Sequence, residues 1–313
     1  MLENNKRDKL IAYDQQKKNN YQHMKNYISI TVAFFLLACQ NSSETLSVLY
    51  SLPKKLKEVS GIIYSEKDNL FWTLEDSGNA NKIYGLSVND GSIQKKMIIV
   101  NTPNIDWEDI TKDAAGNLYI GDFGNNDNVR KDLCIYKIDK NSLDKDEVIP
   151  DYKVSFSYPE QQDFPPKKTK LFFDVEGFFE YNGNFYLFTK NRSKGFDGTS
   201  LVYKISNKAG TQQAILMGKF KTCDSYNHCQ ITSAAISPDD SKVVLLTHDK
   251  VFLFENFKDN NFLNGIQKEF KLNHFSQKEA VCFKDNKTLI IADEKTNKVG
   301  GKVYEVSLDK LSF

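Results

Sequence analysis

The chain has 313 residues, of which 40% are hydrophobic and 27% are charged, and its formal net charge is +1. This length suffices for one large domain, and a balance so close to neutrality gives no strong field that would attract nucleic acid. We find no nucleic-acid recognition motif in the sequence either, so we expect no nucleic-acid partner.

The segment 24–38 has the composition of a secretory signal peptide. It combines a basic start, a short apolar run and a small residue before the expected cut, and the apolar run is too short to span a membrane. Leu36, Leu37 and Ala38 precede Cys39, which resembles the bacterial lipobox, in which the cysteine is lipidated and becomes the mature N-terminus. We expect a lipoprotein signal with lipidation at Cys39; an ordinary signal peptide with an incidental cysteine is the alternative.

The flanks of this signal set the other boundaries. Residues 1–23 are polar and rich in Lys and Asn, and we expect them to be untranslated or disordered, because signals lie at the true N-terminus. Residues 39–45 read as a lipidated cysteine with a polar tether, and residues 46–313 as one folded domain. These boundaries predict an exported protein that is lipid-anchored in the bacterial cell envelope, with the outer membrane favoured.

From residue 46 onwards, short strand-like runs alternate with turn residues. After a first run at 46–52, four units of four runs and a final unit of three runs follow. The units cover residues 60–100, 109–158, 177–221, 234–272 and 280–308. A repeat of this length is typical of stacked or radial β-structures.

The unit count predicts the fold. The last unit lacks a fourth strand, and residues 46–52 lead into the first unit as each outer strand leads into the next unit. This N-terminal strand can therefore complete the last blade, and such closure protects sheet edges. We predict an all-β, five-bladed β-propeller closed by an N-terminal outer strand. A β-sandwich would not explain the period. Six blades are the alternative if a degenerate blade, rather than a loop at 159–170, lies between residues 108 and 176.

Five short segments repeat one pattern and place a hydroxyl or a carboxylate at the same position. This column consists of Ser60, Glu108, Glu176, Ser233 and Glu279, which recur at intervals of 46 to 68 residues. A glycine or alanine follows four of the five, which suits crowding near an axis. Because the first strand of each propeller blade lines the central channel, the five side chains should converge at one mouth.

Carboxylates gathered at one mouth raise one another's pKa unless a cation lies between them. A set of carboxylate and hydroxyl oxygens suits Ca²⁺ better than Zn²⁺, and a wide ring suits Mg²⁺ less well. We therefore predict one axial Ca²⁺ at the column; the alternative is that these residues bond only backbone or water. Two positions earlier, Glu58, Asp106 and Asp174 add acids, either around the same mouth or on surface loops.

The second strand of each blade runs back to the same mouth, and the ends of these strands are polar and charged. Lys190 and Arg192, together with Arg130, could hold an anion there, while a histidine and an aspartate could move a proton or orient water. The candidates for a catalytic role are Asp76, Asp122, His248, Arg192 and Lys190. The alternative for each is the ordinary preference of β-turns for such residues.

Four cysteines follow Cys39. Cys223 and Cys229 flank a short polar loop, and export permits a disulfide that closes it; two free thiols are the alternative. Cys134 and Cys282 lie in apolar strand patterns, so we expect buried thiols. No Cys/His spacing indicates zinc.

Four segments carry a resemblance to known families. EVSGI at 58–62, DWEDI at 106–110, DVEGF at 174–178 and KEAV at 278–281 resemble the SdiA-regulated and esterase-like-phytase group of exported β-propellers. The order Ser, Glu, Glu, Ser, Glu in the column is also similar to that of the five-bladed calcium-activated nucleotidases (apyrases), where such positions bind a central Ca²⁺. By that resemblance the five column residues are the ligands. The acidic, Arg-containing turn of the nucleotidases has only a loose match at 75–78, without Arg.

Two classes of function follow from these features. The first is a monomeric binding or scaffold module whose Ca²⁺ holds the blades together and whose channel mouth recognises a small-molecule or protein ligand. The second is a calcium-dependent hydrolase of a phosphoester, phosphoanhydride or related ester. We favour binding, because the sequence identifies no nucleophile–base pair, and fold alone does not decide between an enzyme and a binding protein.

Overall fold

The structure is a computed structural model that describes Lys17 and residues 46–296 and 299–311. The predicted signal peptide, Cys39 and the tether lie outside the described residues. In the part of the chain that the structure describes, no helix is long and apolar enough to cross a membrane.

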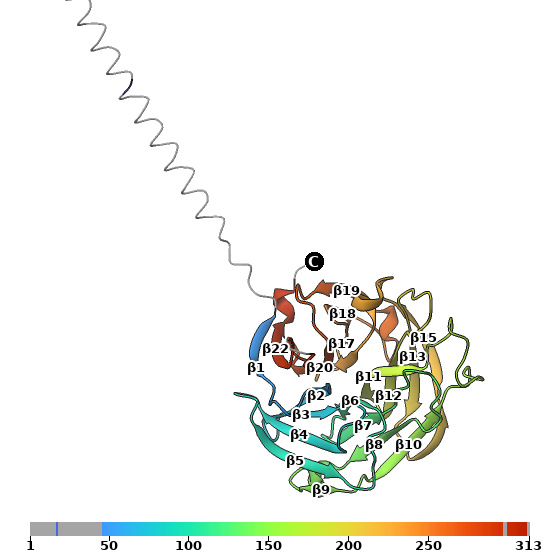
Figure 1. Cartoon of the computed structure of the whole chain (residues 1–313), viewed down its shortest axis with the longest axis horizontal. Helices are drawn as coiled ribbons and strands as arrows, with labels where there is room; N and C mark the ends of the chain where they lie inside the picture. Colours follow the sequence, from blue (N-terminus) through green and yellow to red (C-terminus); the bar gives the residue numbers. More distant parts are fainter. Residues whose placement is uncertain (1–16, 18–45, 297–298, 312–313) are drawn as a thin grey trace, which may run out of the picture. The chain divides into compact units, whose positions relative to one another are not determined.

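Five sheets form a ring, and each sheet is one blade of a β-propeller (Figure 1). Blade 1 contains β2 (Val59–Ser65), β3 (Leu70–Glu75), β4 (Lys82–Ser87) and β5 (Ile93–Ile99). Blade 2 contains β6 (Trp107–Lys112), β7 (Leu118–Asp122), β8 (Cys134–Ile138) and β10 (Tyr152–Ser157). Blade 3 contains β11 (Asp174–Tyr181), β12 (Asn184–Lys190), β13 (Thr199–Ser206) and β15 (Ile215–Lys221).

The last two blades complete the ring. Blade 4 contains β16 (Ser233–Ile236), β17 (Lys242–Leu246), β18 (Lys250–Glu255) and β19 (Ile266–Lys271). Blade 5 contains β20 (Lys278–Asp285), β21 (Thr288–Asp293), β22 (Lys302–Ser307) and, as its outer strand, β1 (Ser47–Ser51). The first strands of successive blades, β2, β6, β11, β16 and β20, contact one another around the central channel. The predicted five-bladed propeller is therefore confirmed.

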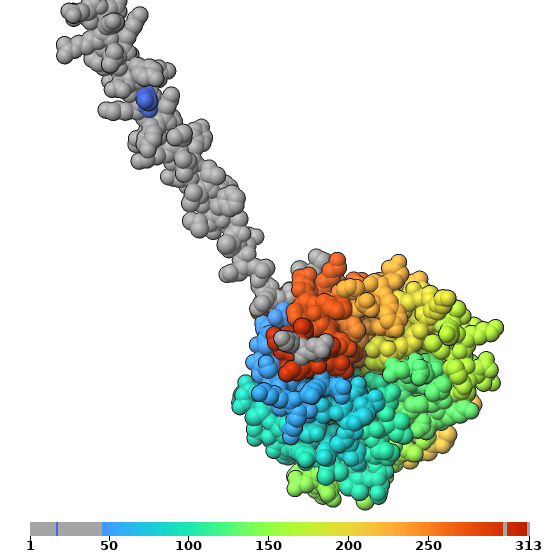
Figure 2. Space-filling view, in the orientation of Figure 1, coloured from blue at the N-terminus to red at the C-terminus, as the bar shows by residue number. Residues whose placement is uncertain are grey.

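The N-terminal strand closes the ring as predicted. β1 pairs antiparallel with β22, from Ser47 opposite Glu305 to Ser51 opposite Lys302, and the amide of Leu52 donates to the carbonyl of Gly301 over 2.8 Å. In the space-filling view the blue start of the domain consequently lies beside its red end (Figure 2). This pairing gives blade 5 a fourth strand and covers the edge of β22.

Two short strands pass from one blade to the sheet of the blade before it. β9 (Glu147–Val148) pairs in parallel with β5, and β14 (Gly210–Gln213) pairs in parallel with β10. The long interval between residues 108 and 176 holds β9 and a loop at 158–173, not another sheet. The six-bladed alternative is therefore wrong. The sequence did not predict either added strand, because each has only two to four residues.

The core lies between the blades, in five apolar clusters, one for each pair of neighbours. Trp72 and Trp107 are fully buried between blades 1 and 2. Phe123 and Phe178 meet edge to face between blades 2 and 3, with ring centroids 5.1 Å apart. Both faces of every sheet are thus covered, which is why central strands such as β3 are buried along their whole length.

Short helical turns complete the structure. They are η1 (Lys140–Ser142), α2 (Tyr226–Cys229), η2 (Phe262–Asn264) and η3 (Leu308–Lys310). Of these, α2 reaches the channel mouth, because it precedes the first strand of blade 4 and contacts the turn after β17.

Candidate axial cation site

A β-bulge near the start of the first strand positions most of the column residues. In β2, β6, β11 and β20 the pairing register skips one residue, and the skipped residues are Ser60, Glu108, Glu176 and Glu279. A bulge of this kind re-aims a side chain and often occurs next to a functional site. All four side chains line one cavity of 210 Å³ at the mouth of the channel.

The fourth blade has no such bulge, and its column residue lies elsewhere. Ser233 pairs directly with Leu246 and is not among the residues that line the cavity in the described part of the chain. Its hydroxyl instead donates to Asp109 Oδ2 over 3.4 Å and accepts from the amide of Val281 over 3.2 Å. The structure thus brings four of the five predicted column residues together, because the missing bulge shifts Ser233 by one position along its strand.

Acidic side chains dominate the cavity. The carboxylates that line it are Asp76, Asp106, Glu108, Glu176, Glu279 and Glu294, and the cationic side chains are Lys190 and Arg192. When the six acids are ionised, they outnumber the two cations, and the mouth then attracts cations.

Three acids lie especially close together, namely two that line the cavity and Asp174 beside them. One oxygen from each of Glu108, Asp174 and Glu176 falls within 4.8 Å of the others, and all three residues are buried. Burial raises the pKa of Glu108 well above its usual range, and the neighbouring Glu176 adds to this shift. Among the described residues, no ion pair involves Glu108. Asp174 belongs to the set that precedes the column by two residues, so the sequence placed it near the mouth without assigning it to the cluster.

Both cationic side chains at the mouth contact these acids. Lys190 Nζ lies 3.1 Å from Glu176 Oε2 and 3.9 Å from Glu279 Oε2. Arg192 reaches Asp174 with Nε at 2.6 Å and Glu176 with Nη2 at 2.7 Å. Burial alone would lower the pKa of Lys190, but Glu176 and Glu279 raise it above its usual value. The two cations, predicted as anion holders, therefore compensate part of the acidic cluster.

His248 also reaches the mouth. Its Nε2 lies 3.1 Å from Glu279 Oε1, and its Nδ1 lies 3.0 Å from the carbonyl oxygen of Asn227 in α2. Burial would raise the pKa of Glu279, but Lys190 and His248 hold it below its usual value. The column acid of blade 5 is thus ionised and bonded from two sides.

Asp76 lines the cavity as predicted, and so does Glu294, which follows β21. Burial raises the pKa of Asp76 to about 7, and repulsion from Glu58 and Asp106 contributes to the shift. Burial likewise raises the pKa of Glu294 to about 8, with Glu279 and Asp76 as further causes. These two acids titrate near neutral pH and can hold or release a proton there. Glu294 directly follows Asp293, the last residue of β21, and this acidic pair at the end of a second strand is the sequence signal for it.

Asp122 and Arg130 form a separate pair behind the mouth. Asp122 Oδ1 accepts from Arg130 Nη2 over 2.9 Å and from the amide of Asp106 over 3.2 Å. Arg130 Nη1 donates to the carbonyl of Gly124 over 2.9 Å. Neither side chain is among those that line the cavity within the described residues, so this pair holds the loop after β7 in place.

Comparisons with known proteins identify a fold and no family. No protein-family model matches the chain, and no curated protein matches it. The PQQ-bound aldose sugar dehydrogenase from Streptomyces coelicolor is a similar solved structure, with a TM-score of 0.50 and 9% identity, over 84% of this chain and 97% of that one. At this identity the similarity shows the β-propeller fold alone.

Two further solved structures have lower TM-scores. The WD40 repeats of RRP9 match with a TM-score of 0.43 and 10% identity, over 85% of this chain and 98% of that one. U3-55K matches with a TM-score of 0.42 and 13% identity, over 84% of this chain and 98% of that one. None of these comparisons supports membership of the SdiA-regulated or nucleotidase groups.

Proposed function

We propose that this chain is a calcium-binding β-propeller that serves as a ligand-binding or scaffold module. The observation that carries this proposal is the buried cluster of Glu108, Asp174 and Glu176, whose oxygens lie within 4.8 Å of one another. With Glu279 the mouth has four central carboxylates against the two cations Lys190 and Arg192. When all four carboxylates are ionised, they carry two negative charges more than the cations compensate, and one divalent cation would neutralise that excess.

The donor atoms suit a hard cation. They are carboxylate oxygens together with the Ser60 hydroxyl, whose hydrogen is directed to the carbonyl of Trp107 over 2.9 Å, so its lone pairs are available to the cavity. An all-oxygen set with room for several ligands is the chemistry that Ca²⁺ prefers. We propose that the cation is held by Ser60, Glu108, Asp174, Glu176 and Glu279. Ser233 would support the site indirectly, through its hydrogen bond to Asp109.

A bound cation would join four of the five blades, since its proposed ligands come from blades 1, 2, 3 and 5. A ligand that binds only the folded state stabilises that state, by about 2.7 kcal/mol at a concentration one hundred times the Kd. The Ca²⁺ would therefore fix the blades around the mouth, and the mouth would offer its acids and cations to a polar ligand.

The test is a Ca²⁺ titration followed by melting temperature. We expect the melting temperature of the wild type to rise with Ca²⁺ and to fall back with chelator. Glu108→Gln should abolish this rise. Because burial raises the pKa of the Glu108 carboxyl, folding at neutral pH protonates a group that is ionised in the unfolded chain. Gln does not titrate, so this variant should also raise the melting temperature of the calcium-free protein. The exposed Glu147→Gln is the matched control and should respond like the wild type. A wild type that does not respond to Ca²⁺ would refute the proposal.

A calcium-dependent hydrolase is the second candidate. The observation in its favour is that Lys190 and Arg192 lie beside the proposed cation site, where they can stabilise negative charge on a phosphoester or related substrate. Asp76 lines the same cavity and can accept a proton from water. Phosphate release from a panel of nucleotides and phytate, with and without chelator, tests this candidate. Calcium-dependent stability without turnover in this panel would contradict the hydrolase and leave the binding module as the proposed function.

We also propose that the protein is exported as a monomer and lipid-anchored at Cys39 in the bacterial cell envelope. The residues before Cys39 support this proposal, and a disulfide between Cys223 and Cys229 suits an oxidising compartment. Labelling of cells with a fatty-acid analogue should mark the wild type and Cys282→Ser but not Cys39→Ser. Equal labelling of the three would contradict lipidation at Cys39.

A further inference from the structure

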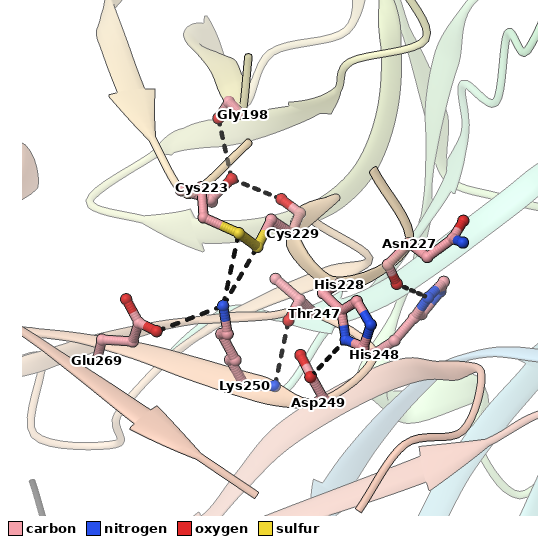
Figure 3. Close-up of a disulfide and its surroundings, with 11 residues drawn as sticks. Gly198, Cys223, Asn227, His228, Cys229, Thr247, His248, Asp249, Lys250 and Glu269 are labelled. Carbon is pink, nitrogen blue, oxygen red and sulfur yellow. Dashed lines mark hydrogen bonds and ion pairs between the residues drawn. A yellow bond between two sulfur atoms is a disulfide. The ribbon is translucent and has the colours of Figure 1, made fainter. Parts of the chain in front are cut away.

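A buried ammonium group lies beside the disulfide in the loop between β15 and β16 (Figure 3). Cys223 and Cys229 have Cα atoms 5.5 Å apart. Lys250, the first residue of β18, places its Nζ 3.5 Å from Cys223 Sγ and 3.3 Å from Cys229 Sγ. Its ion-pair partner among the described residues is Glu269, at 3.4 Å.

The sulfurs of a disulfide are neutral and weak acceptors, so they compensate a buried ammonium poorly. A thiolate in the same place would compensate it well, and a neighbouring lysine lowers the pKa of a cysteine. The buried position of Lys250, which is 9% exposed, therefore stabilises the reduced form of this pair. A solvent-exposed disulfide would have a smaller preference for its reduced form.

The two sulfurs differ in access. Cys229 is 1% exposed, whereas Cys223 is only half-buried and precedes the exposed Asp224. An external thiolate can therefore reach Cys223 first, and Cys229 is the sulfur that would leave towards Lys250.

We propose that Cys223 and Cys229 form a thiol–disulfide exchange site for an external dithiol. One thiolate of the dithiol attacks Cys223 Sγ, the bond to Cys229 Sγ breaks, and Cys229 leaves as a thiolate beside the Lys250 ammonium. The second thiolate of the dithiol then attacks the dithiol's other sulfur, which is held in the mixed disulfide, and Cys223 leaves as a thiolate. The chain gains two electrons, the dithiol leaves as a disulfide, and the released thiolates take up protons according to their pKa.

Opening the disulfide would affect the axial mouth. The loop that it closes carries α2, in which the carbonyl of Asn227 bonds His248 Nδ1, and His248 Nε2 contacts Glu279 Oε1. His228 of the same helix bonds Asp249 Oδ2 over 2.7 Å. Once the loop is released, His248 loses the carbonyl that orients its imidazole ring. Glu279 then loses a side-chain partner that would compete with a cation for its carboxylate. This consequence rests on the proposed Ca²⁺ site, and we expect reduction to tighten Ca²⁺ binding roughly five-fold.

The first experiment measures how fast dithiothreitol reduces the folded protein. We expect the rate of disulfide reduction to be proportional to the dithiothreitol concentration, and the wild type alone is enough to measure this. We expect Lys250→Met to be reduced roughly ten times more slowly, because its leaving thiolate loses the ammonium. Lys250→Arg should keep most of the wild-type rate, and the exposed Lys258→Met is the matched control. A rate independent of dithiothreitol, or a rate unchanged in a folded Lys250→Met, would overturn the exchange site.

The second experiment compares the oxidised protein with the double variant Cys223→Ser, Cys229→Ser. The imidazole NMR signals of His248 should shift between the two without Ca²⁺, and the Kd for Ca²⁺ should fall in the variant. Unchanged imidazole signals would overturn the link to the mouth. If the imidazole shifts but neither protein binds Ca²⁺, the cation site fails and the link between disulfide and mouth stands.

Discussion

The Asp109 carboxylate of blade 2 accepts a hydrogen bond from the Ser233 hydroxyl of blade 4, over 3.4 Å and across 124 residues of sequence. These two blades are not neighbours in the ring, because β11 lies between β6 and β16. Asp109 also accepts from the amide of Ile110 over 2.8 Å and from that of Phe178 in blade 3 over 3.2 Å. One buried side chain therefore joins three blades beneath the acidic mouth.

This relationship predicts that Asp109 is important for stability. Asp109→Ala leaves the amide of Phe178 without its acceptor, and an unsatisfied buried donor costs about 1–3 kcal/mol. We expect a loss of this size in the free energy of unfolding, measured with urea, and about 1 kcal/mol for Ser233→Ala. Asp163→Ala, at an exposed position, should leave the unfolding midpoint unchanged. An Asp109→Ala protein as stable as this control would contradict a stabilising role.

Gly124 should be essential for the geometry of the acidic cluster. A Cβ atom at this position would overlap Glu108 Oε1 and the carboxylate of Asp106. Gly124→Ala should therefore displace Glu108 and weaken Ca²⁺ binding by roughly ten-fold or more, as changes next to metal ligands commonly do. Isothermal titration calorimetry measures this effect. Gly218→Ala, whose new Cβ would meet only a flexible Leu263 side chain, should bind like the wild type.

The raised pKa values at the mouth predict a stability that falls as the pH rises. Asp76 and Glu294 titrate at about 7 and about 8 in the folded protein, but near 4 in an unfolded chain. Between these values the folded state holds more protons, so the free energy of unfolding decreases with increasing pH. We therefore expect a higher melting temperature at about pH 5 than at about pH 8 in chelator.

One substitution and one ligand should each reduce this dependence of the melting temperature on pH. Asp76→Asn removes one titrating group, and Ca²⁺ compensates the charges that appear on deprotonation. The exposed Asp163→Asn is the control and should retain the full slope. A melting temperature that rises from about pH 5 to about pH 8 in chelator would show that the mouth acids are not protonated in the folded state.

The closing strand should be required for a stable monomer. β1 covers the edge of β22 and contributes the buried Tyr50, with Leu52 directly after it. A chain that starts after residue 52 should lose about 2 kcal/mol for each of these side chains, and the exposed edge should promote association. A chain that starts at residue 45 retains β1 and is the control. Light scattering after size exclusion should find the first chain associated and the second monomeric.

The sequence predicted the fold because each blade repeats the same local pattern. Turn residues and apolar runs mark the strands, and both the number of blades and the closing role of the strand before Leu52 follow from their order. The added strands β9 and β14 did not follow, because a pairing of two to four residues depends on where the neighbouring blade lies.

The site was predicted less completely, for a physical reason. The segment around Ser233 resembles the other column segments, yet only those have a bulge at the column position. A bulge depends on the pairing with the second strand, which similarity between first strands does not reveal. Likewise, the sequence placed Lys190 and Arg192 at the mouth, but their contacts with Glu176 depend on side-chain geometry.

The charged side chains are distributed asymmetrically around the mouth. Both cations come from blade 3, since Lys190 ends β12 and Arg192 follows it. Asp76 and Glu294 come from blades 1 and 5, on the other part of the ring. Once Asp76 and Glu294 are ionised, the cations and these two acids lie on different parts of the ring, and a molecule with unlike ends that enters the mouth meets a preferred direction.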